Sequence, residues 1–235
     1  MSGISCKDVY LEEGRRVLEA NILPEKYCNF DCIFCPIGRS GHKSDAPVDF
    51  GDAGTALAEF GEAIARTRPD LVFINSKGEA LLHARIREFI ALAKGGGLPV
   101  RLLSNGYLLN DERYRDIANG CEEVTGELKA VTEEHFQRLQ RPIAGYTLEK
   151  YVSGMEAFRR QYGGKFLLEI TIIRGYDDGG EAVSALKDAI RRLAPDRLTV
   201  VRLEEERFRR SLRVDDESFS AISRELAGEA GPGAS

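Results

Sequence analysis

Three cysteines stand close together near the start of the chain, within residues 26–40, KYCNFDCIFCPIGRS. Cys28, Cys32 and Cys35 are spaced C-x3-C-x2-C, so their thiolates can converge on one side of a loop. Soft thiolate ligands favour iron–sulfur clusters, zinc or copper(I) over hard cations. Because a 4Fe-4S cube has four irons, three cysteines leave one iron open to a ligand that the protein does not supply. The motif therefore predicts a metal centre with an open position, as catalytic sites have.

The sequence C-N-F-D-C-I-F-C, with Phe34 directly before the third cysteine, resembles the cluster motif of the radical S-adenosylmethionine (SAM) superfamily. In that family the amine and carboxylate of SAM chelate the open iron. One electron from the cluster cleaves the sulfonium to a 5′-deoxyadenosyl radical, which abstracts a hydrogen atom from a substrate. The resemblance implies Cys28, Cys32 and Cys35 as catalytic metal ligands, with Phe34 beside the cofactors. It also implies a 4Fe-4S cluster and SAM as cofactors, and a flavodoxin- or ferredoxin-like electron donor.

Two other interpretations of the cysteines stay open at this stage. The three thiolates and His42 would suit a zinc knot in a non-enzymatic binding protein on a degenerate barrel, although zinc sites more often use paired C-x2-C units. Unliganded core cysteines are the other interpretation. Cys6 and Cys121, the remaining cysteines, are too few to hold a second cluster by cysteine ligation alone, so we expect no auxiliary cluster.

Composition restricts the classes of function. The 235 residues suit one domain, and a hydrophobic content of 43% suffices for a sizeable core. A net charge of −5 and a pI near 5.5 give no general attraction to phosphate backbones, so nucleic acid would need a local basic patch. The first residues lack the apolar core of a signal peptide, and no run approaches the roughly 20 apolar residues of a membrane span. A cytoplasmic protein without membrane contact is expected.

Apolar periodicity predicts a regular alternation of strands and helices. Short runs rich in β-formers predict six strands, at residues 17–23, 71–75, 100–103, 123–128, 166–173 and 198–203. Helical stripes follow them, at residues 49–66, 86–93, 114–117, 136–139, 148–158, 183–193 and 219–226. The pattern predicts an α/β fold, a partial (β/α)6 TIM-like barrel with parallel strands, whose active site lies where the strand ends feed their loops.

Four segments are expected along the chain. They are an N-terminal segment (1–16), the radical SAM partial barrel (17–204), a C-terminal extension and helix (205–227), and a flexible tail (228–235). The extension carries a basic cluster, which we interpret as a solvated face in preference to an RNA contact; its members are Arg207, Arg209, Arg210 and Arg213.

A glycine and a carboxylate follow the second predicted strand, at Gly78 and Glu79. Glycine lets the backbone approach a ligand closely, and the acid can accept hydrogen bonds from an ammonium group. The pair resembles the family's GGEP element, which binds the SAM amino group, with Lys77 in place of the first glycine and Ala80 in place of the proline. The resemblance implies that Gly78 and Glu79 contact SAM.

Two further groups of candidate residues stand at the ends of the third and fourth predicted strands. The turn Ser104-Asn105-Gly106 resembles the family's small-hydroxyl–Asn–Gly turn and implies SAM contacts, chiefly from Ser104. Glu127 and Lys129 share one face of a strand, toward the barrel interior. Their surroundings resemble the wyosine-type tRNA-modifying enzymes with the two charges exchanged, while the order acid-x-lysine resembles the glycyl-radical-enzyme activases. We expect both to bind the ribose or carboxylate of SAM in preference to forming a structural ion pair.

Glu169 in the fifth strand and Arg202 at the end of the sixth complete the candidates. The wyosine-type group resembles this chain in having the glutamate and a later G-x-N-D turn, where Asp177 takes the place of the asparagine. Arg202 is placed like the family's arginine near the substrate, where it can pair bidentately with a carboxylate or phosphate. A buried ion pair between Glu169 and Arg202 is the alternative. The candidate cofactor-binding residues are therefore Phe34, Gly78, Glu79, Ser104, Asn105, Glu127, Lys129, Glu169 and Arg202.

The substrate stays open. Within the class that the resemblance implies, the alternatives are modification of tRNA, a peptide or a small molecule, and activation of a glycyl-radical enzyme. A barrel without a capping domain would suit a large substrate that completes the closure itself.

Overall fold

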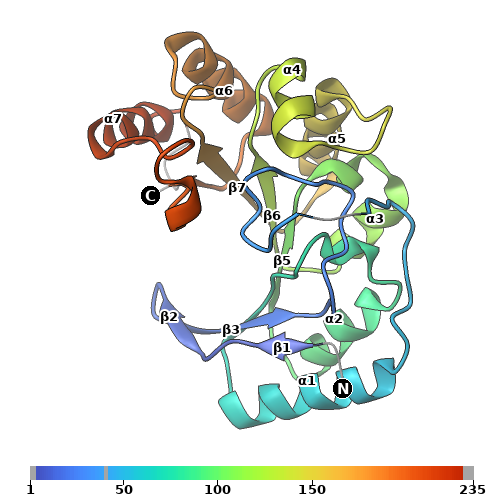
Figure 1. The fold of residues 1–235 in the computed structure, drawn as a ribbon. Coiled ribbons are helices and arrows are strands. Elements are labelled where there is room, and N and C mark those ends of the chain that lie inside the picture. Colours follow the sequence, from blue (N-terminus) through green and yellow to red (C-terminus); the bar gives the residue numbers. More distant parts are fainter. Residues whose placement is uncertain (1–3, 40–41, 230–235) are drawn as a thin grey trace.

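A single sheet of eight strands runs through the molecule (Figure 1). The computed structural model describes residues 4–39 and 42–229. Six strands pair in parallel and in chain order, and two short strands near the N-terminus pair antiparallel with the first of them. The strands are β1 (Ser5–Cys6), β2 (Tyr10–Glu12), β3 (Arg15–Asn21), β4 (Leu71–Ile74), β5 (Val100–Ser104), β6 (Glu123–Leu128), β7 (Lys165–Ile172) and β8 (Arg197–Arg202). The predicted α/β partial barrel is confirmed.

Helices connect the parallel strands and pack on the outside of the curved sheet (Figure 1). Those of ten or more residues each bury one apolar stripe, as α2 does with Phe89 and Ile90. Among the described residues, no helix is both long and apolar enough to cross a membrane. The helices are α1 (Ala53–Thr67), α2 (Ile86–Gly95), α3 (Glu112–Ala118), α4 (Glu133–His135), α5 (Leu148–Gln161), α6 (Gly180–Leu193) and α7 (Asp216–Ala227), and the π-helix Phe136–Gln140 continues α4.

The N-terminal segment contains structure that the sequence pattern did not predict. β1 and β2 are only two and three residues long, too short for a visible alternation of apolar and polar residues. Leu11 in β2 is 74% exposed, so hydrophobicity at this position does not mark a buried face. At the other end, most of the predicted tail, 228–235, falls outside the described residues.

The barrel is open on one side, between β8 and the β1–β2 end of the sheet. The described residues show no backbone pairing across this gap. At the amino ends of the strands, however, side chains bridge it: Arg197 on β8 pairs with Glu12 and Glu13 at 3.1 and 2.9 Å. Arg101 pairs with Glu12 at 2.7 Å and with Glu123 at 2.6 Å inside the same layer. These ion pairs join the two edges of the gap at the amino ends of the strands. At the carboxyl ends, Arg207, which follows β8, donates from Nη2 to the carbonyl of Cys35 in the cysteine loop at 2.6 Å.

Candidate active site

The three cysteines of the motif line one cavity of about 420 Å³ near the carboxyl ends of the parallel strands. This volume lies in the range typical of small-ligand sites. Several candidate cofactor-binding residues line the same cavity, namely Phe34, Gly78, Asn105, Glu127 and Lys129. The fold therefore brings together the cysteine loop after β3 and residues that follow β4, β5 and β6.

An aromatic cage holds the cysteine loop in place. Phe30, between the first two cysteines, is 1% exposed. Its ring packs edge-on against Tyr107, Phe136, Tyr146 and Tyr151 at centroid distances of 5.7 to 6.4 Å. Edge-to-face pairs of this kind contribute about 0.5–1.5 kcal/mol each beyond the burial of area. The loop is thus anchored at its middle by a side chain that carries no metal-binding group.

A second anchor joins the cysteine loop to the loop after β4. Tyr27 N donates to the carbonyl of Lys77 at 3.2 Å, and Glu79 N donates to the carbonyl of Tyr27 at 2.9 Å. Gly78, between them, has φ of +138°, and a Cβ built on it would lie 2.0 Å from the Tyr27 oxygen. Only glycine fits this approach. Gly78 therefore fixes the backbone one residue before Cys28.

Burial affects two thiols of the motif. Burial raises the pKa of Cys28 to about 12, and burial also raises the pKa of Cys32 above its usual value. A buried thiol forms a thiolate only beside compensating positive charge, which a bound metal supplies. Within the described residues, no three His, Cys, Asp or Glu side chains are grouped as one metal ion requires.

Glu79 and Ser104 lie within the protein, beside the cavity wall. Glu79 is 0% exposed, and its carboxylate accepts hydrogen bonds from Ser104 Oγ at 3.1 Å and from the backbone N of Asn105 at 2.8 Å. Burial raises the pKa of Glu79 to about 7, although these bonds and one from Leu81 N oppose the rise. In this structure the carboxylate holds the turn after β5 in place. A direct contact of Glu79 or Ser104 with SAM stays a prediction, and Asn105 is the residue of this turn that lines the cavity.

Three charged residues meet on the interior face of β6 and β7. Lys129 Nζ lies 2.6 Å from Glu127 Oε1 and 5.4 Å from the centre of the Phe34 ring. Glu169 is the register partner of Glu127 on β7. Burial, followed by the charge of Glu127, raises the pKa of Glu169 to about 7. Burial alone would lower the pKa of Lys129, but Glu127, Cys32 and Glu169 raise it. Two carboxylates thus share one cation, Glu127 and Lys129 line the cavity, and their ion pair is compatible with a cofactor contact.

The prediction for Arg202 needs correction. Arg202 pairs in register with Ile172, three residues after Glu169 on β7, so it points to the opposite face of the sheet from Glu169. Its guanidinium bonds Glu204 at 2.7 Å and Asp216 at 2.5 Å, outside the barrel. Neither a pair with Glu169 nor a place at the cavity follows. Because strand side chains alternate, a one-residue difference in register is enough to turn a side chain from the interior to the exterior.

Other residues at the cavity carried no signal in the sequence. Gln140, in the π-helix, lines the cavity, is 1% exposed and leaves its Oε1 without a partner among the described residues. Lys26 and Lys77 also line it. Asn29, directly after Cys28, is fully buried and accepts a hydrogen bond from Asn105 Nδ2 at 2.6 Å. Only Asn29 could have been found from the sequence, because it lies inside the cysteine motif. Gln140 belongs to the π-helix, which is distant from the motif in the sequence.

Comparisons with known sequences agree with this site. The sequence profile of the radical SAM superfamily matches residues 22–188. A UPF0026 protein of Synechocystis sp. is 26% identical over 155 residues, which is 66% of this chain and 58% of that protein. The chain spans between 27% and 58% of the length of the curated relatives that it matches.

Solved structures share the fold. A structure of TYW1 with a lysine-pyruvate adduct bound has a TM-score of 0.68 at 16% identity, and the match covers 91% of this chain and 74% of that one. A radical SAM methyltransferase from Sphaerobacter thermophilus has a TM-score of 0.69 at 15% identity, with 97% and 67% covered. At these identities the likenesses show the fold alone.

The profile match covers most of the chain and includes all three cysteines of the motif. Enzymes of this family use a 4Fe-4S cluster and SAM, and the three thiols line a cavity at the expected end of the barrel. The chain therefore belongs to the radical SAM superfamily of enzymes.

Proposed function

We propose that this enzyme cleaves SAM reductively at a single 4Fe-4S cluster and abstracts a hydrogen atom from its substrate. The observation that carries the proposal is the joint lining of one cavity by Cys28, Cys32 and Cys35. When bound, the cluster supplies the electron that breaks the sulfonium bond of SAM. The residues of this chain bind and orient the two cofactors and keep water away from them.

The described residues fit both cofactors. The three thiols supply the soft donor set that iron prefers. Lys129 and Glu127 present a cation and an anion to the cavity from one strand face, so they can bind the carboxylate and the ribose hydroxyls of SAM. Gln140 offers a buried, unpartnered acceptor oxygen on the same wall. A ligand donor at this oxygen would remove the cost of leaving it unsatisfied.

The open side of the barrel supports a substrate that is part of a larger molecule. Thr199 lies on the interior face of β8, in register with Glu169, and is nevertheless exposed. Solvent therefore reaches the interior from the gap beside β8. We propose that the substrate group enters through this gap and that the rest of its molecule covers it. Equal turnover of a free small molecule and of the same group within a polymer would contradict this part of the proposal.

Metal analysis tests the proposed cluster. The chain is purified and reconstituted without oxygen as wild type, Cys32→Ala and Cys121→Ala, and iron, sulfide and zinc are measured. Cys121 is a matched control, because it is a buried cysteine at the amino end of β6, outside the cavity lining. We expect about four irons per chain in wild type and Cys121→Ala and a large loss in Cys32→Ala. Stoichiometric zinc without sulfide in wild type would overturn the proposal in favour of a zinc-stabilised binding protein.

A further inference from the structure

The cavity that the cysteines line also extends to the N-terminal edge of the sheet. Its lining there comes from β1 and the residue that follows it, from β3, and from the loop after β4. We call this side the N-terminal wall, and it consists of Ser5, Lys7, Glu19, Asn21, Asn75 and Lys77. Because β1 is an edge strand of the sheet, the wall borders the gap through which the substrate is proposed to enter.

The polar side chains of the N-terminal wall bind one another. Glu19 accepts a hydrogen bond from Asn75 Nδ2 at 2.9 Å and pairs with Lys7 Nζ at 2.6 Å. Asn21 Oδ1 accepts a hydrogen bond from the backbone N of Lys77 at 2.8 Å. The wall is therefore a connected network in which the one carboxylate, that of Glu19, is already balanced by a cation.

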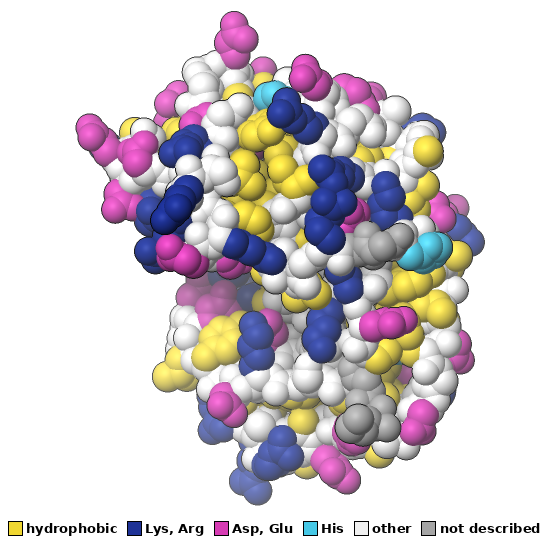
Figure 2. All heavy atoms as spheres, in the orientation of Figure 1, with side chains coloured by type: hydrophobic (Ala, Val, Ile, Leu, Met, Phe, Trp, Pro, Cys, Tyr) yellow, Lys and Arg dark blue, Asp and Glu magenta, His cyan; other side chains and the backbone are white. Residues whose placement is uncertain are grey.

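The ammonium group of Lys77 is the exception in this network. It forms no ion pair or side-chain hydrogen bond with any residue that the structure describes, although the residue is half-buried and lines the cavity. The other lysines of the lining each have an acidic partner within 3.8 Å, and they are Lys7, Lys26 and Lys129. Figure 2 shows further Lys and Arg side chains on the face that carries the cysteine loop, and such a face attracts anions.

We propose that Lys77 binds a carboxylate group of the substrate. This inference rests on the proposed function, because it names the chemical class of the molecule that shares the cavity with SAM. The backbone of Lys77 is fixed on both sides, since its N donates to Asn21 and its carbonyl accepts from Tyr27 N at 3.2 Å. An anion held by its ammonium group therefore lies beside the loop that carries the cysteines, where the hydrogen atom is to be abstracted.

Two observations separate this role from the binding of SAM. The GGEP element has a glycine where this chain has Lys77, so the binding of the SAM amino group uses no side chain at this position. Because that amino group is cationic, the ammonium of Lys77 attracts a different group. Lys129 is the cation proposed for the carboxylate of SAM, and it already pairs with Glu127. The charge of Lys77 is thus left for the second molecule in the cavity.

The charge of Lys77 matches a carboxylate better than a phosphate. One lysine balances the single negative charge of a carboxylate, whereas a phosphate monoester carries about −1.5 to −2 at pH 7. The excess would lie in the same wall as Glu19. A nucleic-acid strand is held through several phosphates by several cations, among which arginine is favoured. Within the described part of the chain, no arginine lines this cavity.

Lysine labelling tests the proposal on the reconstituted chain with SAM present. Trace reductive methylation without oxygen labels deprotonated amines, and mass spectrometry gives the rate at each lysine. We expect N-acetylglycine, at constant ionic strength, to slow the labelling of Lys77 about threefold or more, because an ion pair covers the amine and holds it protonated. The neutral N-acetylglycinamide should leave the rate unchanged. An acetylated and amidated Gly-Glu-Gly peptide is the second carboxylate probe, and the stronger of the two identifies a small acid or a peptide side chain as the source.

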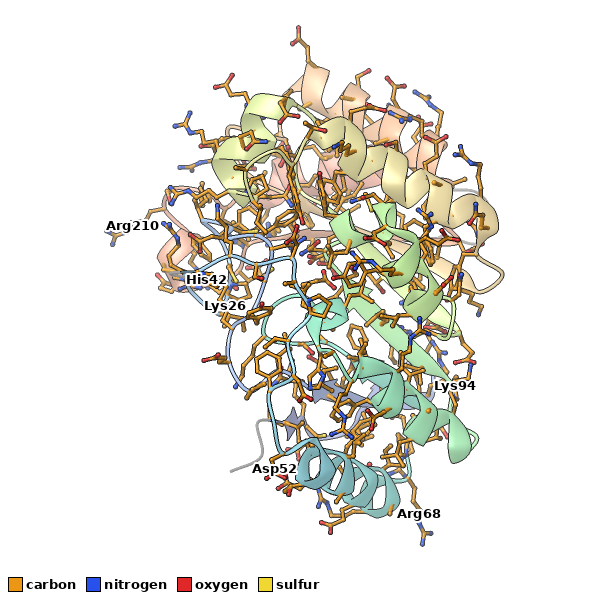
Figure 3. The ribbon with its side chains drawn as sticks, turned by 90° about the vertical axis from the view of Figure 1, so that its right-hand side faces the viewer. Lys26, His42, Asp52, Arg68, Lys94 and Arg210 are labelled. Atoms are coloured by element: carbon orange, nitrogen blue, oxygen red, sulfur yellow. The ribbon has the colours of Figure 1, made fainter. Side chains whose placement is uncertain are left out.

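Two exposed lysines outside the described cavity lining, Lys94 and Lys150, are the references for labelling. Figure 3 shows Lys94 on the opposite side of the molecule from Lys26, which lines the cavity. Equilibrium dialysis of radiolabelled N-acetylglycine supplies a second readout. We expect Lys77→Met to weaken binding about three- to tenfold, Lys77→Arg, which keeps the charge, to stay within about twofold of wild type, and Lys150→Met to match wild type.

Several results would overturn the proposal. They are equal labelling of Lys77 with and without both carboxylate probes, equal protection of Lys150, and full protection of Lys77 by SAM alone. Protection by inorganic phosphate or bulk tRNA, without protection by either carboxylate, would overturn it as well. Iron, sulfide and deoxyadenosine are measured on the same preparation. A wild-type chain without cluster or deoxyadenosine refutes the proposed function, whereas an active chain with an unprotected Lys77 overturns this inference alone.

Discussion

Replacing Gly78 by alanine should damage the cysteine loop more than the same change at any other glycine that the structure describes. The added Cβ would lie 2.0 Å from the Tyr27 carbonyl oxygen, which is backbone and cannot rotate away. Overpacking of this kind costs about 1–3 kcal/mol. The φ of +138° adds about 1–3 kcal/mol of backbone strain for a non-glycine residue. The expected loss in the free energy of unfolding is therefore about 2–6 kcal/mol. Relaxation of the loop around the new side chain would reduce this loss.

Gly97→Ala is the matched control. Gly97 also has a positive φ, +76°, but a Cβ there meets nothing within 4 Å, so only the strain is added, about 1–2 kcal/mol. Each kcal/mol lowers Tm by about 2–4 °C in a chain of this size. Thermal unfolding and the iron content of both variants measure the effect. Gly78→Ala should lose more stability and most of its iron, because Tyr27 precedes Cys28. Equal Tm values and full iron in both variants would refute the reasoning.

Three further changes test the charged residues. Lys129→Met should cost about 3–5 kcal/mol, because it leaves Glu127 and Glu169 without their shared cation, and the added change Glu127→Gln should restore part of the loss in denaturant unfolding. Asp177 is buried with both carboxylate oxygens unpartnered among the described residues, and burial, with the nearby charge of residue 178, raises its pKa from 3.8 to about 8. Because the pKa of Asp177 is higher in the folded state than in the unfolded chain, its contribution to the free energy of unfolding is present below about pH 4 and is lost as pH rises toward 8. Asp177→Asn should flatten this fall in stability with pH. An unchanged pH profile of stability would contradict the burial argument. Arg202→Ala should leave deoxyadenosine formation unchanged and lower stability only slightly, because its ion pairs lie outside the barrel, whereas a loss of activity would restore Arg202 to the site.

Most strands and helices of the barrel followed from the sequence because they bury a continuous apolar stripe. β6 begins and ends at the predicted residues, and helices such as α5 begin where a threonine cap precedes the stripe. β1 and β2 were not predicted because they are stabilised by pairing with β3, and this tertiary contact leaves no pattern in their own short sequences.

The site was predictable only in part. The cysteines and the Glu127–Lys129 pair were visible because their spacing alone places them on one loop and one strand face. The outward direction of Arg202 depends on strand register, which a one-residue difference inverts. Gln140 enters the cavity from a π-helix, and the cage around Phe30 is assembled from three separate segments. Contacts of this kind are set by tertiary packing and have no local signature.

The most direct test of the account is the formation of 5′-deoxyadenosine after anaerobic reconstitution, with SAM and a strong reductant added. Wild type and Cys121→Ala should form deoxyadenosine, and Cys28→Ala, Cys32→Ala and Cys35→Ala should not, because each removes one thiol from the cavity. Deoxyadenosine formed equally by the three single variants, or by none of the proteins that carry a full cluster, would contradict the claim that these cysteines hold the centre that cleaves SAM.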